Sequence, residues 1–292
     1  MQCTNPKFII RKDKKFFRHH KNPLKASALH PCGLCMACRI NRSTEWADRL
    51  IHEMESWHDH CFVTLTYDND SLPKGNLIID DNYKNYIKHN YIDKNLVPPI
   101  HPASLKKKHI QDWIKRLRHH LDPDPIVYYI CGEYGEHTLR PHYHAIMFGI
   151  GINKMKTLGN KLWGMCDPTL FHVDMCVPES IRYVTKYITK SHLGKYSTYY
   201  NVMGIEPPFT LCSQGIGARW AFQNEKRIKS DMYIISSNGT KHPIPRYYRK
   251  LLNITEGMLP EEDYDKTLSK QLTQNQREAN LQKMSENRRN KL

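Results

Sequence analysis

The chain has 292 residues, 39% of them hydrophobic, so it can bury the core of one substantial domain with appendages or of two small domains. Its 44 Lys and Arg residues oppose 29 Asp and Glu residues, and the formal charge of +15 favours a polyanionic partner, with nucleic acid ahead of an anionic membrane surface. No stretch approaches the roughly 20 apolar residues of a membrane helix, and the charged start argues against a signal peptide, so we expect a soluble cytosolic protein.

The first local feature is a cluster of cysteines, because Cys32, Cys35 and Cys38 follow one another at short spacings. In a reducing compartment such clustering indicates metal more than disulfides, and a tetrahedral site needs a fourth ligand. Cys3 is the first candidate for that ligand and His30 the second. Zinc is the preferred ion, while an iron–sulfur centre and thiols without metal stay open as alternatives. The other cysteines are expected to be ordinary buried residues: Cys61, Cys131, Cys166, Cys176 and Cys212.

Helical spacing of apolar residues predicts an amphipathic helix over residues 41–57, leading out of the cysteine cluster. A buried strand is predicted at residues 61–67, which are rich in β-branched and aromatic side chains. Residues 70–101 are polar and indicate a long excursion of the chain, that is, a long connection between the strand and the next helix. A second helix is predicted over residues 103–121, and its polar face carries the basic side chains of Lys106, Lys107, Lys108, Lys115, Arg116 and Arg118.

Two further strands are predicted at residues 126–133 and 142–149, joined by a connection typical of a hairpin. A fourth strand follows at residues 170–177, and then a helix from Pro178 to about Lys190, whose Pro and Glu suit a first turn. Beyond it we expect a short helix after residue 217 and a last hairpin around Asn238 and Gly239. Antiparallel strands with intervening helices predict an α+β fold: an antiparallel central sheet with helices on one face.

A pair of histidines on the third strand forms the first candidate site. Strand side chains alternate, so His142 and His144 project from one face about 7 Å apart, and Tyr143 points the other way. Two imidazoles and one carboxylate can hold a divalent ion, Mg²⁺ or Mn²⁺, that polarises a phosphodiester. Glu133, in the preceding strand, is the candidate third ligand.

A pair of tyrosines on the following helix forms the second candidate site. Tyr183 and Tyr187 are four residues apart, so they share a helix face and can visit the same phosphate in turn. A tyrosine hydroxyl is a weak nucleophile that needs activation. Lys186 and Lys190, each three residues after a tyrosine, are candidates to stabilise the charge that develops.

Each pair alone is a weak signal, because His58 with His60 and Tyr196 with Tyr200 repeat the same spacings elsewhere in the chain. Taken singly, the histidines are more simply explained as hydrogen-bonded structural residues, and the tyrosines as the packed face of a helix. The position of each histidine pair in the chain distinguishes the functional from the structural interpretation. The strand pair of histidines lies in an apolar run beside a carboxylate, whereas the other pair is expected at the polar end of a helix. In a basic chain this combination favours the functional interpretation.

Three segments together resemble the motifs of HUH endonucleases: residues 62–67, residues 140–145 and residues 183–190. The tyrosines lie downstream of the histidines, which is the order in replication initiators of that superfamily. The chain resembles most closely the replication initiation proteins of gokushovirus-type Microviridae, small single-stranded DNA phages, at residues 31–39, 132–135 and 245–248. Tyr143 departs slightly from the family formula, which has a hydrophobic residue between the histidines.

The resemblance implies a metal-dependent nicking and closing endonuclease that starts and terminates rolling-circle replication. One tyrosine would attack single-stranded origin DNA, become linked to the 5′ phosphate and free a 3′ hydroxyl. The second tyrosine would cleave the regenerated origin. The implied partners are origin DNA and the host polymerase and helicase, with no membrane partner, in the cytoplasm of a bacterial host.

The same resemblance suggests three regions: residues 1–60 with the cysteine cluster and amphipathic helix, residues 61–250 with the RRM-like or palm-like HUH endonuclease domain, and residues 251–292 as a charged tail. Basic residues on the second helix are expected to contact DNA, as are Arg246, Tyr247, Tyr248 and Arg249, whose tyrosines could stack on unpaired bases. Two other functions stay open. One is a zinc-bearing DNA-binding protein without catalysis, and the other is a single-tyrosine HUH transposase.

Overall fold

The computed structural model describes residues 3, 7–10, 27–76, 81, 84–85, 102–135, 138–190 and 195–255. At residues 7–10, 27–30, 188–190 and 195–198 it describes the backbone alone. Most of the predicted excursion at 70–101, and the predicted tail beyond residue 255, lie outside the described residues.

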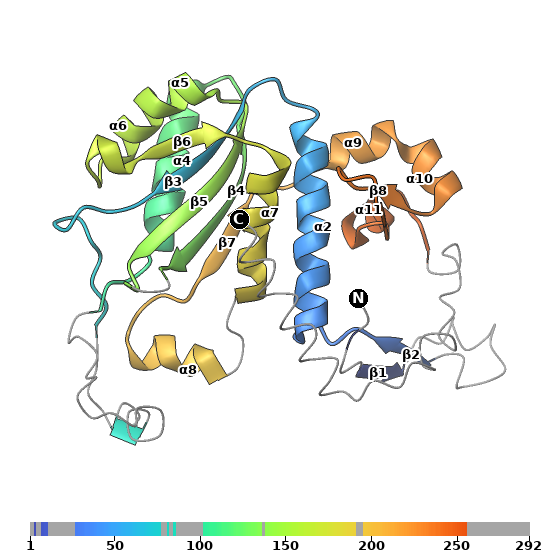
Figure 1. The fold of residues 1–292 in the computed structure, drawn as a ribbon, viewed down its shortest axis with the longest axis horizontal. Coiled ribbons are helices and arrows are strands. Elements are labelled where there is room, and N and C mark those ends of the chain that lie inside the picture. The colour runs from blue at the N-terminus through green and yellow to red at the C-terminus, as the bar shows by residue number, and fades with distance from the viewer. Residues whose placement is uncertain are drawn as a thin grey trace.

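A five-stranded antiparallel sheet forms the centre of the molecule, with strand order β6-β3-β5-β4-β7 (Figure 1). The strands are β3 His60–Leu65, β4 Val127–Tyr134, β5 Pro141–Phe148, β6 His172–Met175 and β7 Phe209–Cys212. Four of them match predicted strands. β7 was not predicted, because its four residues are too few to show a period of two.

One face of the sheet is covered by α4 (Lys107–Leu121). Its buried residues, Ile110, Trp113, Ile114, Leu117 and Leu121, recur at helical spacing and pack against side chains of β3 and β5 in one hydrophobic cluster. Burying each such side chain contributes about 1.5–3 kcal/mol to folding. The same face carries the short α5 (Ile152–Lys154), a π-helical turn (Met155–Gly159), α6 (Asn160–Trp163) and a 3-10 turn (Pro168–Leu170).

The opposite face is covered by α7 (Pro178–Lys190) and, outside it, by the long α2 (Met36–Met54) (Figure 1). Both helices contribute to a second cluster with β4 and β5, in which Leu50, Ile181 and Val184 are fully buried. The α+β class is therefore confirmed, but the prediction of helices on one face is wrong. The sheet needs two covers because β4 and β5 have apolar side chains on both faces.

The C-terminal part of the described chain forms a small unit beside α2 (Figure 1). It has its own hydrophobic cluster, which contains Trp220 and Tyr248. The predicted short helix is α9, and the predicted hairpin at Asn238 and Gly239 is present with shorter strands. Its elements are α9 Ala218–Gln223, α10 Glu225–Asp231, β8 Ile234–Ile235, β9 Lys241–His242 and α11 Arg246–Leu251.

A two-stranded sheet of β1 (Lys7–Ile10) and β2 (Ser27–His30) lies near the N-terminal end of α2 (Figure 1). One more helix, α8 (Lys195–Val202), follows α7 in the chain. Neither the small sheet nor α8 was predicted from the sequence. Within the described residues, no helix combines the length and apolar character needed to cross a bilayer.

Candidate functional site

The histidine pair and Glu133 converge at the centre of the sheet. β4 and β5 form a hairpin whose register places Glu133 directly opposite His142. One carboxylate oxygen, Oε1 of Glu133, lies 2.8 Å from Nε2 of His142 and 3.5 Å from Nε2 of His144. The three side chains present ligand atoms that all lie within 4.8 Å of one another. The structure thus brings together the three residues that the sequence proposed as metal ligands.

The outer nitrogen of each imidazole is held by a further contact. Nδ1 of His142 lies 3.2 Å from the carbonyl oxygen of Arg140, and Nδ1 of His144 lies 3.1 Å from the hydroxyl of Thr64. Such contacts fix the ring orientation so that Nε2 faces the carboxylate. Thr64 was not predicted as a site residue. Its position follows from the register of β3, where it pairs with His144.

The donor set fits a divalent cation. His142 faces an acceptor at both nitrogens, the Arg140 carbonyl at Nδ1 and the Glu133 carboxylate at Nε2. A neutral imidazole has a single N–H and cannot donate to both. An imidazolium donates from both nitrogens, whereas with a cation held between Nε2 and the carboxylate a neutral ring donates from Nδ1 alone. Two imidazoles and one carboxylate also leave coordination positions for other oxygen ligands.

Glu133 carries a negative charge in this site although it is buried. Burial by itself would raise the pKa of its carboxyl group, but hydrogen bonds from His142 and His144 outweigh that effect and lower the pKa to about 2. The carboxylate is therefore available as a ligand throughout the physiological pH range.

The tyrosine pair lies against the histidines on the same face of the sheet. α7 begins with Pro178 and has Glu179 in its first turn, both as predicted. The ring of Tyr187 stacks on His144 with a centroid distance of 5.4 Å, and the ring of Tyr183 meets His144 edge to face at 5.2 Å. The tyrosine pair and the histidine strand thus form one continuous candidate site, although some forty residues separate them in the chain.

The two tyrosines occupy different environments. Tyr187 is 9% exposed, whereas Tyr183 is half-buried. The hydroxyl of Tyr187 donates a hydrogen bond to that of Tyr183. Burial, followed by the charge of Glu133, raises the pKa of Tyr187 well above its ordinary value. Ionisation of Tyr187 is therefore disfavoured unless a cation offsets that charge.

Of the two lysines predicted to act on α7, the structure describes the side chain of only one. Lys186 is half-buried, one position before Tyr187, on a helix face adjacent to that of the tyrosines. The side chain of Lys190 lies outside the part of the chain whose side chains are described. Both remain candidates to offset negative charge during the reaction.

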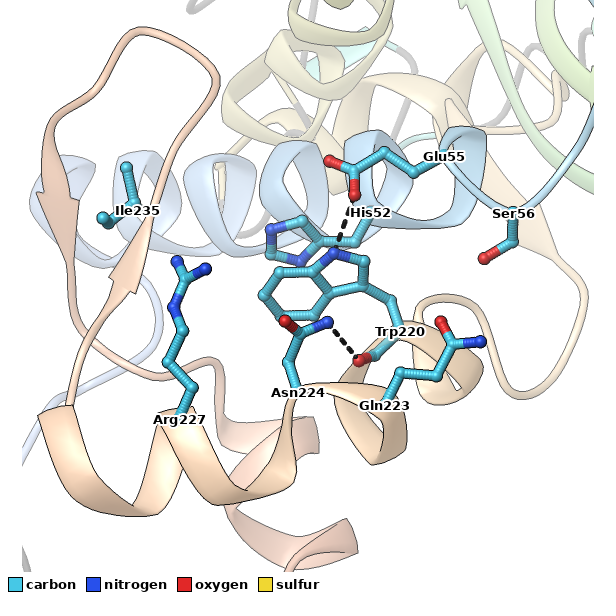
Figure 2. A pocket seen from close by; sticks show the side chains of 8 residues that line it. All are labelled: His52, Glu55, Ser56, Trp220, Gln223, Asn224, Arg227 and Ile235. Carbon is cyan, nitrogen blue, oxygen red and sulfur yellow. Dashed lines mark hydrogen bonds between the residues drawn. The ribbon is translucent and has the colours of Figure 1, made fainter.

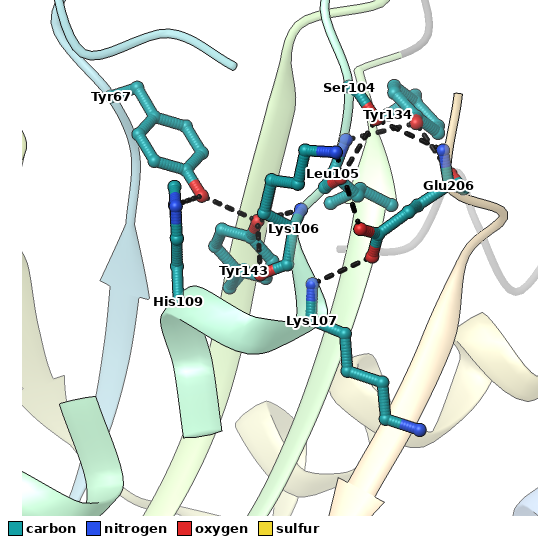
Figure 3. Close-up of polar contacts among 9 residues, drawn as sticks. All are labelled: Tyr67, Ser104, Leu105, Lys106, Lys107, His109, Tyr134, Tyr143 and Glu206. Carbon is teal, nitrogen blue, oxygen red and sulfur yellow. Dashed lines mark hydrogen bonds and ion pairs between the residues drawn. The ribbon is translucent and has the colours of Figure 1, made fainter. Parts of the chain in front are cut away.

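A hydrogen-bonded network on the other side of β5 holds the histidine strand in place (Figure 3). Tyr143 is fully buried, and its hydroxyl lies 2.8 Å from that of Tyr67 and accepts a 2.8 Å hydrogen bond from the backbone N–H of Lys106. The Tyr67 hydroxyl in turn lies 3.0 Å from Nδ1 of His109 on α4. The tyrosine between the two histidines therefore anchors β5 to the start of α4. The sequence predicted its direction but not these partners.

The basic residues of α4 lie behind the sheet, on the helix that covers the face opposite the histidine pair. Arg116 donates to the carbonyl of Leu162 at 3.0 Å, and the ammonium of Lys106 lies 3.6 Å from Glu206. The exposed members of the predicted set are Lys107, Lys108, Lys115 and Arg118. Any DNA contact that they make is thus separate from the metal site.

The predicted DNA-binding residues near residue 247 lie in the C-terminal unit. Arg246 is exposed on α11, Arg249 is half-buried, and the Tyr247 ring lies 4.0 Å from the guanidinium of Arg49. Tyr248 is fully buried, so it cannot stack on a base, contrary to expectation. The sequence analysis overestimated how many side chains of this segment could stack on bases, because the sequence does not show which aromatic side chain faces the interior.

A hollow of about 380 Å³ lies between the end of α2 and α9–α10 (Figure 2). Its floor is the ring of Trp220, stacked on His52 with a centroid distance of 3.5 Å, and Nε1 of Trp220 donates to Glu55 at 2.8 Å. These contacts join the C-terminal unit to α2. We assign this hollow a role in packing, since Glu55 and Asn224 in its lining are hydrogen-bonded to Trp220.

The four cysteines proposed as metal ligands also lie together. Cys3, Cys32, Cys35 and Cys38 present sulfur atoms within 4.8 Å of one another. Cys3, the first candidate for the fourth position, is thus in place, while the side chain of His30 is outside those described. Of the cysteines expected to be ordinary buried residues, Cys166 is half-buried and Cys212 is exposed, so the expectation was wrong for these two.

The second histidine pair has no comparable setting. His58 is exposed in the connection after α2, and His60 is the first residue of β3, so the two are not at the polar end of a helix as expected. No carboxylate in the described part of the chain completes a three-ligand group with them. Context within an apolar strand is the sequence signal that separates the two pairs.

Comparison with known families gives a match to the model of the replication-associated protein ORF2 family, over residues 60–192. That range begins with β3 and ends just after α7. It therefore contains Glu133, both histidines and both tyrosines of the site.

Two phage proteins are similar over most of the chain. Replication-associated protein VP4 of Bdellovibrio phage phiMH2K is 28% identical over 245 residues, covering 77% of this chain and 67% of that protein. Replication-associated protein ORF2 of Spiroplasma virus 4 is 29% identical over 237 residues, covering 75% and 66%. The aligned region thus spans about two thirds of the length of these relatives.

Among solved structures, the N-terminal nuclease domain of non-structural protein 1 from minute virus of mice is matched over 70% of this chain and 88% of that one, at 11% identity. The TM-score is 0.21, which is too low to superpose individual residues.

Proposed function

We propose that this chain, whose residues 60–192 match the replication-associated protein ORF2 family, initiates rolling-circle replication by nicking single-stranded origin DNA with a tyrosine. The observation that carries the proposal is the packing of Tyr183 and Tyr187 on His144, one of three residues with metal-ligand spacing. A nucleophile beside a cation site is the arrangement that phosphodiester cleavage requires.

Glu133, His142 and His144 would hold the divalent ion, Mg²⁺ or Mn²⁺. When bound, the ion supplies positive charge that polarises the scissile phosphate and offsets the charge of the transition state. The contacts of Arg140 and Thr64 keep the imidazoles oriented before DNA arrives. Such preorganisation lowers the cost of assembling the site during the reaction.

The tyrosine oxygen attacks the phosphorus atom, and the bond from phosphorus to the 3′ oxygen breaks. The enzyme is left joined to the 5′ phosphate, and the 3′ oxygen leaves as a hydroxyl after taking up a proton. Lys186, the residue before Tyr187 in α7, would offset negative charge on the reacting oxygens. The second tyrosine, four residues away on the same helix face, repeats the attack when the origin is regenerated.

In this proposal the freed 3′ hydroxyl is extended by the host polymerase, with a host helicase separating the strands, in the cytoplasm of the infected bacterium. The names of the phage relatives support a role in replication. The basic charge of the chain suits a nucleic-acid substrate.

The experiment is a covalent trapping assay with the full chain. Single-stranded oligonucleotides that tile the DNA carrying this gene are incubated with protein and Mn²⁺, and products are separated under denaturing conditions. We expect one oligonucleotide to give a protein–DNA adduct, lost in the Tyr183→Phe/Tyr187→Phe double variant and kept in Tyr233→Phe, which removes a hydroxyl in the C-terminal unit.

Three results separate the proposal from its alternatives. DNA binding without any adduct, from folded protein, would favour a DNA-binding protein without catalysis. If cleavage and rejoining both depend on the same single tyrosine, the result would favour a single-tyrosine transposase. An adduct that survives in the double variant would exclude both tyrosines as nucleophiles.

A further inference from the structure

The four clustered cysteines come from three places in the chain and meet at the N-terminal end of α2. Cys3 precedes the β1–β2 sheet and Cys32 follows it, Cys35 is the N-cap of α2, and Cys38 lies in its first turn. Figure 1 shows the small sheet lying at this end of the helix. The site is on α2 and not on the strands that carry Glu133 and the histidines.

The distances between the sulfur atoms fit a tetrahedral metal site. Sγ of Cys3 lies 3.7 Å from Sγ of Cys35, and Sγ of Cys32 lies 4.0 Å from Sγ of Cys38. A tetrahedron with zinc–sulfur bonds of about 2.3 Å has edges of about 3.8 Å. A disulfide would bring two sulfurs to about 2.05 Å, so neither pair is oxidised.

Backbone N–H groups point at two of the sulfurs, as is expected around thiolates. The N–H of Cys32 donates to Sγ of Cys3 at 3.3 Å, and those of Leu34 and Cys35 donate to Sγ of Cys32 at 3.5 and 3.3 Å. Gly33, with a φ of +76°, makes the turn that directs these amides towards Cys32. Donation to sulfur favours the charged form, which is the form that binds metal.

The start of α2 supplies a second source of positive potential. Its first turn, all of which is described, has no acidic residue, and the side chain of the N-cap residue does not cap the helix amides. The free amides and dipole at a helix N-terminus favour nearby anions, so a thiolate of Cys35 suits this place. Burial and the neighbouring thiols raise the pKa of Cys38, so its thiolate depends on a bound cation. The geometry therefore combines four sulfur ligands with backbone donors directed at two of them.

We propose that Cys3, Cys32, Cys35 and Cys38 bind one Zn²⁺ in a closed structural site that joins the segment preceding β1 to the start of α2. Four protein ligands leave no open position, so this ion takes no part in substrate binding. In an iron–sulfur cluster the four cysteines are divided among two or more irons, and cysteines on different irons lie farther apart than the 4.8 Å limit that all four sulfurs meet here. The proposal is independent of the nuclease function.

The first test measures metal in the full chain, purified under reducing conditions. Mass spectrometry of the elements is expected to find one zinc per chain in the wild type. The Cys35→Ser and Cys38→Ser variants are expected to retain less than about a tenth of that zinc, because a site with three thiolates binds far more weakly. Cys212→Ser, which changes an exposed cysteine outside the cluster, is the matched control and should keep it.

Two further measurements locate the ion and test its ligands. The His142→Ala/His144→Ala variant should keep its zinc, which shows that the ion is not in the histidine site. In wild-type protein, four of the nine cysteines should become reactive towards a thiol reagent only after chelation, a result that needs no variant to fold. Iron in place of zinc, no metal, or four cysteines that react equally before and after chelation would each overturn the assignment.

Discussion

At the scale of single residues, the site depends on Glu133, whose carboxylate is shared by two imidazoles. Its burial would favour the neutral acid, but the hydrogen bonds that it accepts hold its pKa at about 2. The charge, and not only the shape, of this side chain is therefore what the proposed metal site would require.

Replacing Glu133 by Gln keeps the shape and removes the charge. We expect the affinity for Mn²⁺, measured by calorimetry on the full chain, to fall by at least about tenfold, in line with losses at metal ligands and their supports. Glu179→Gln removes an exposed carboxylate from the first turn of α7 and should leave the affinity unchanged. Equal affinities for wild type and Glu133→Gln would exclude this carboxylate as a ligand.

The two tyrosines should also differ when changed singly. Tyr183 is the more exposed and accepts a hydrogen bond from Tyr187, which stabilises its ionised form, whereas burial and Glu133 raise the pKa of Tyr187. We therefore expect Tyr183→Phe to slow the first cleavage by at least about 100-fold, and Tyr187→Phe to slow it by less than about fivefold. Single-turnover adduct formation measures both rates. The reverse order would assign the first attack to Tyr187.

At the scale of elements, β5 contributes side chains to both faces of the sheet. His142 and His144 face α7, and Tyr143 between them enters the core beneath α4 and meets Tyr67 and the backbone of Lys106 (Figure 3). The alternation of strand side chains makes this division possible. The face that carries the proposed site is thus supported by contacts on the opposite side of the sheet.

Removing the Tyr143 hydroxyl should weaken this support. In Tyr143→Phe the buried N–H of Lys106 loses its acceptor, and we expect the free energy of unfolding to fall by about 1–3 kcal/mol. Urea denaturation measures the change, with Tyr233→Phe as a control for loss of a tyrosine hydroxyl outside the core. Metal affinity should stay within about twofold, because the histidines project from the other face. An unchanged midpoint would mean that the network contributes no net stability.

At the scale of the whole molecule, α2 connects three parts of the chain. The cysteine cluster lies at its start, α7 packs along it, and the C-terminal unit packs at its end through His52, Trp220 and Tyr248 (Figure 1). We retain the division into residues 1–60, 61–250 and 251–292 as a proposal. The described contacts place α2 in the same core as the tyrosine helix.

The junction at His52 should make stability depend on pH. Burial, and secondarily the charge of Arg227, lower the pKa of His52 to about 3, whereas in the unfolded chain it is near 6.5. Between these values the unfolded state binds the proton that the folded state excludes. Stability is therefore lost as pH falls from about 6.5 towards 3, by at most about 1.4 kcal/mol per pH unit from this group.

Thermal or urea unfolding at several pH values measures this effect. The His52→Asn variant can keep a polar partner for the Tyr248 hydroxyl but has no group that titrates in this range. Its stability should fall less steeply with acid than that of the wild type. Identical slopes for the two proteins would show that His52 does not contribute to the acid dependence.

The sequence by itself determined which residues share a face. Alternation along β5 put His142 and His144 together with Tyr143 opposite, and the four-residue spacing on α7 aligned Tyr183 with Tyr187. These are properties of local geometry, so they can be read from neighbouring residues. The same locality explains why most strands and both long helices of the core could be predicted.

Only the tertiary structure decided what those faces meet. The strand order, the addition of β7, the covering of both faces of the sheet, and the pairing of Thr64 with His144 all join segments far apart in the chain. Cys3 likewise joins cysteines some thirty residues away. Closing the loops between such segments costs conformational entropy, and burial across the whole molecule has to offset that cost, so no local sequence pattern predicts these contacts.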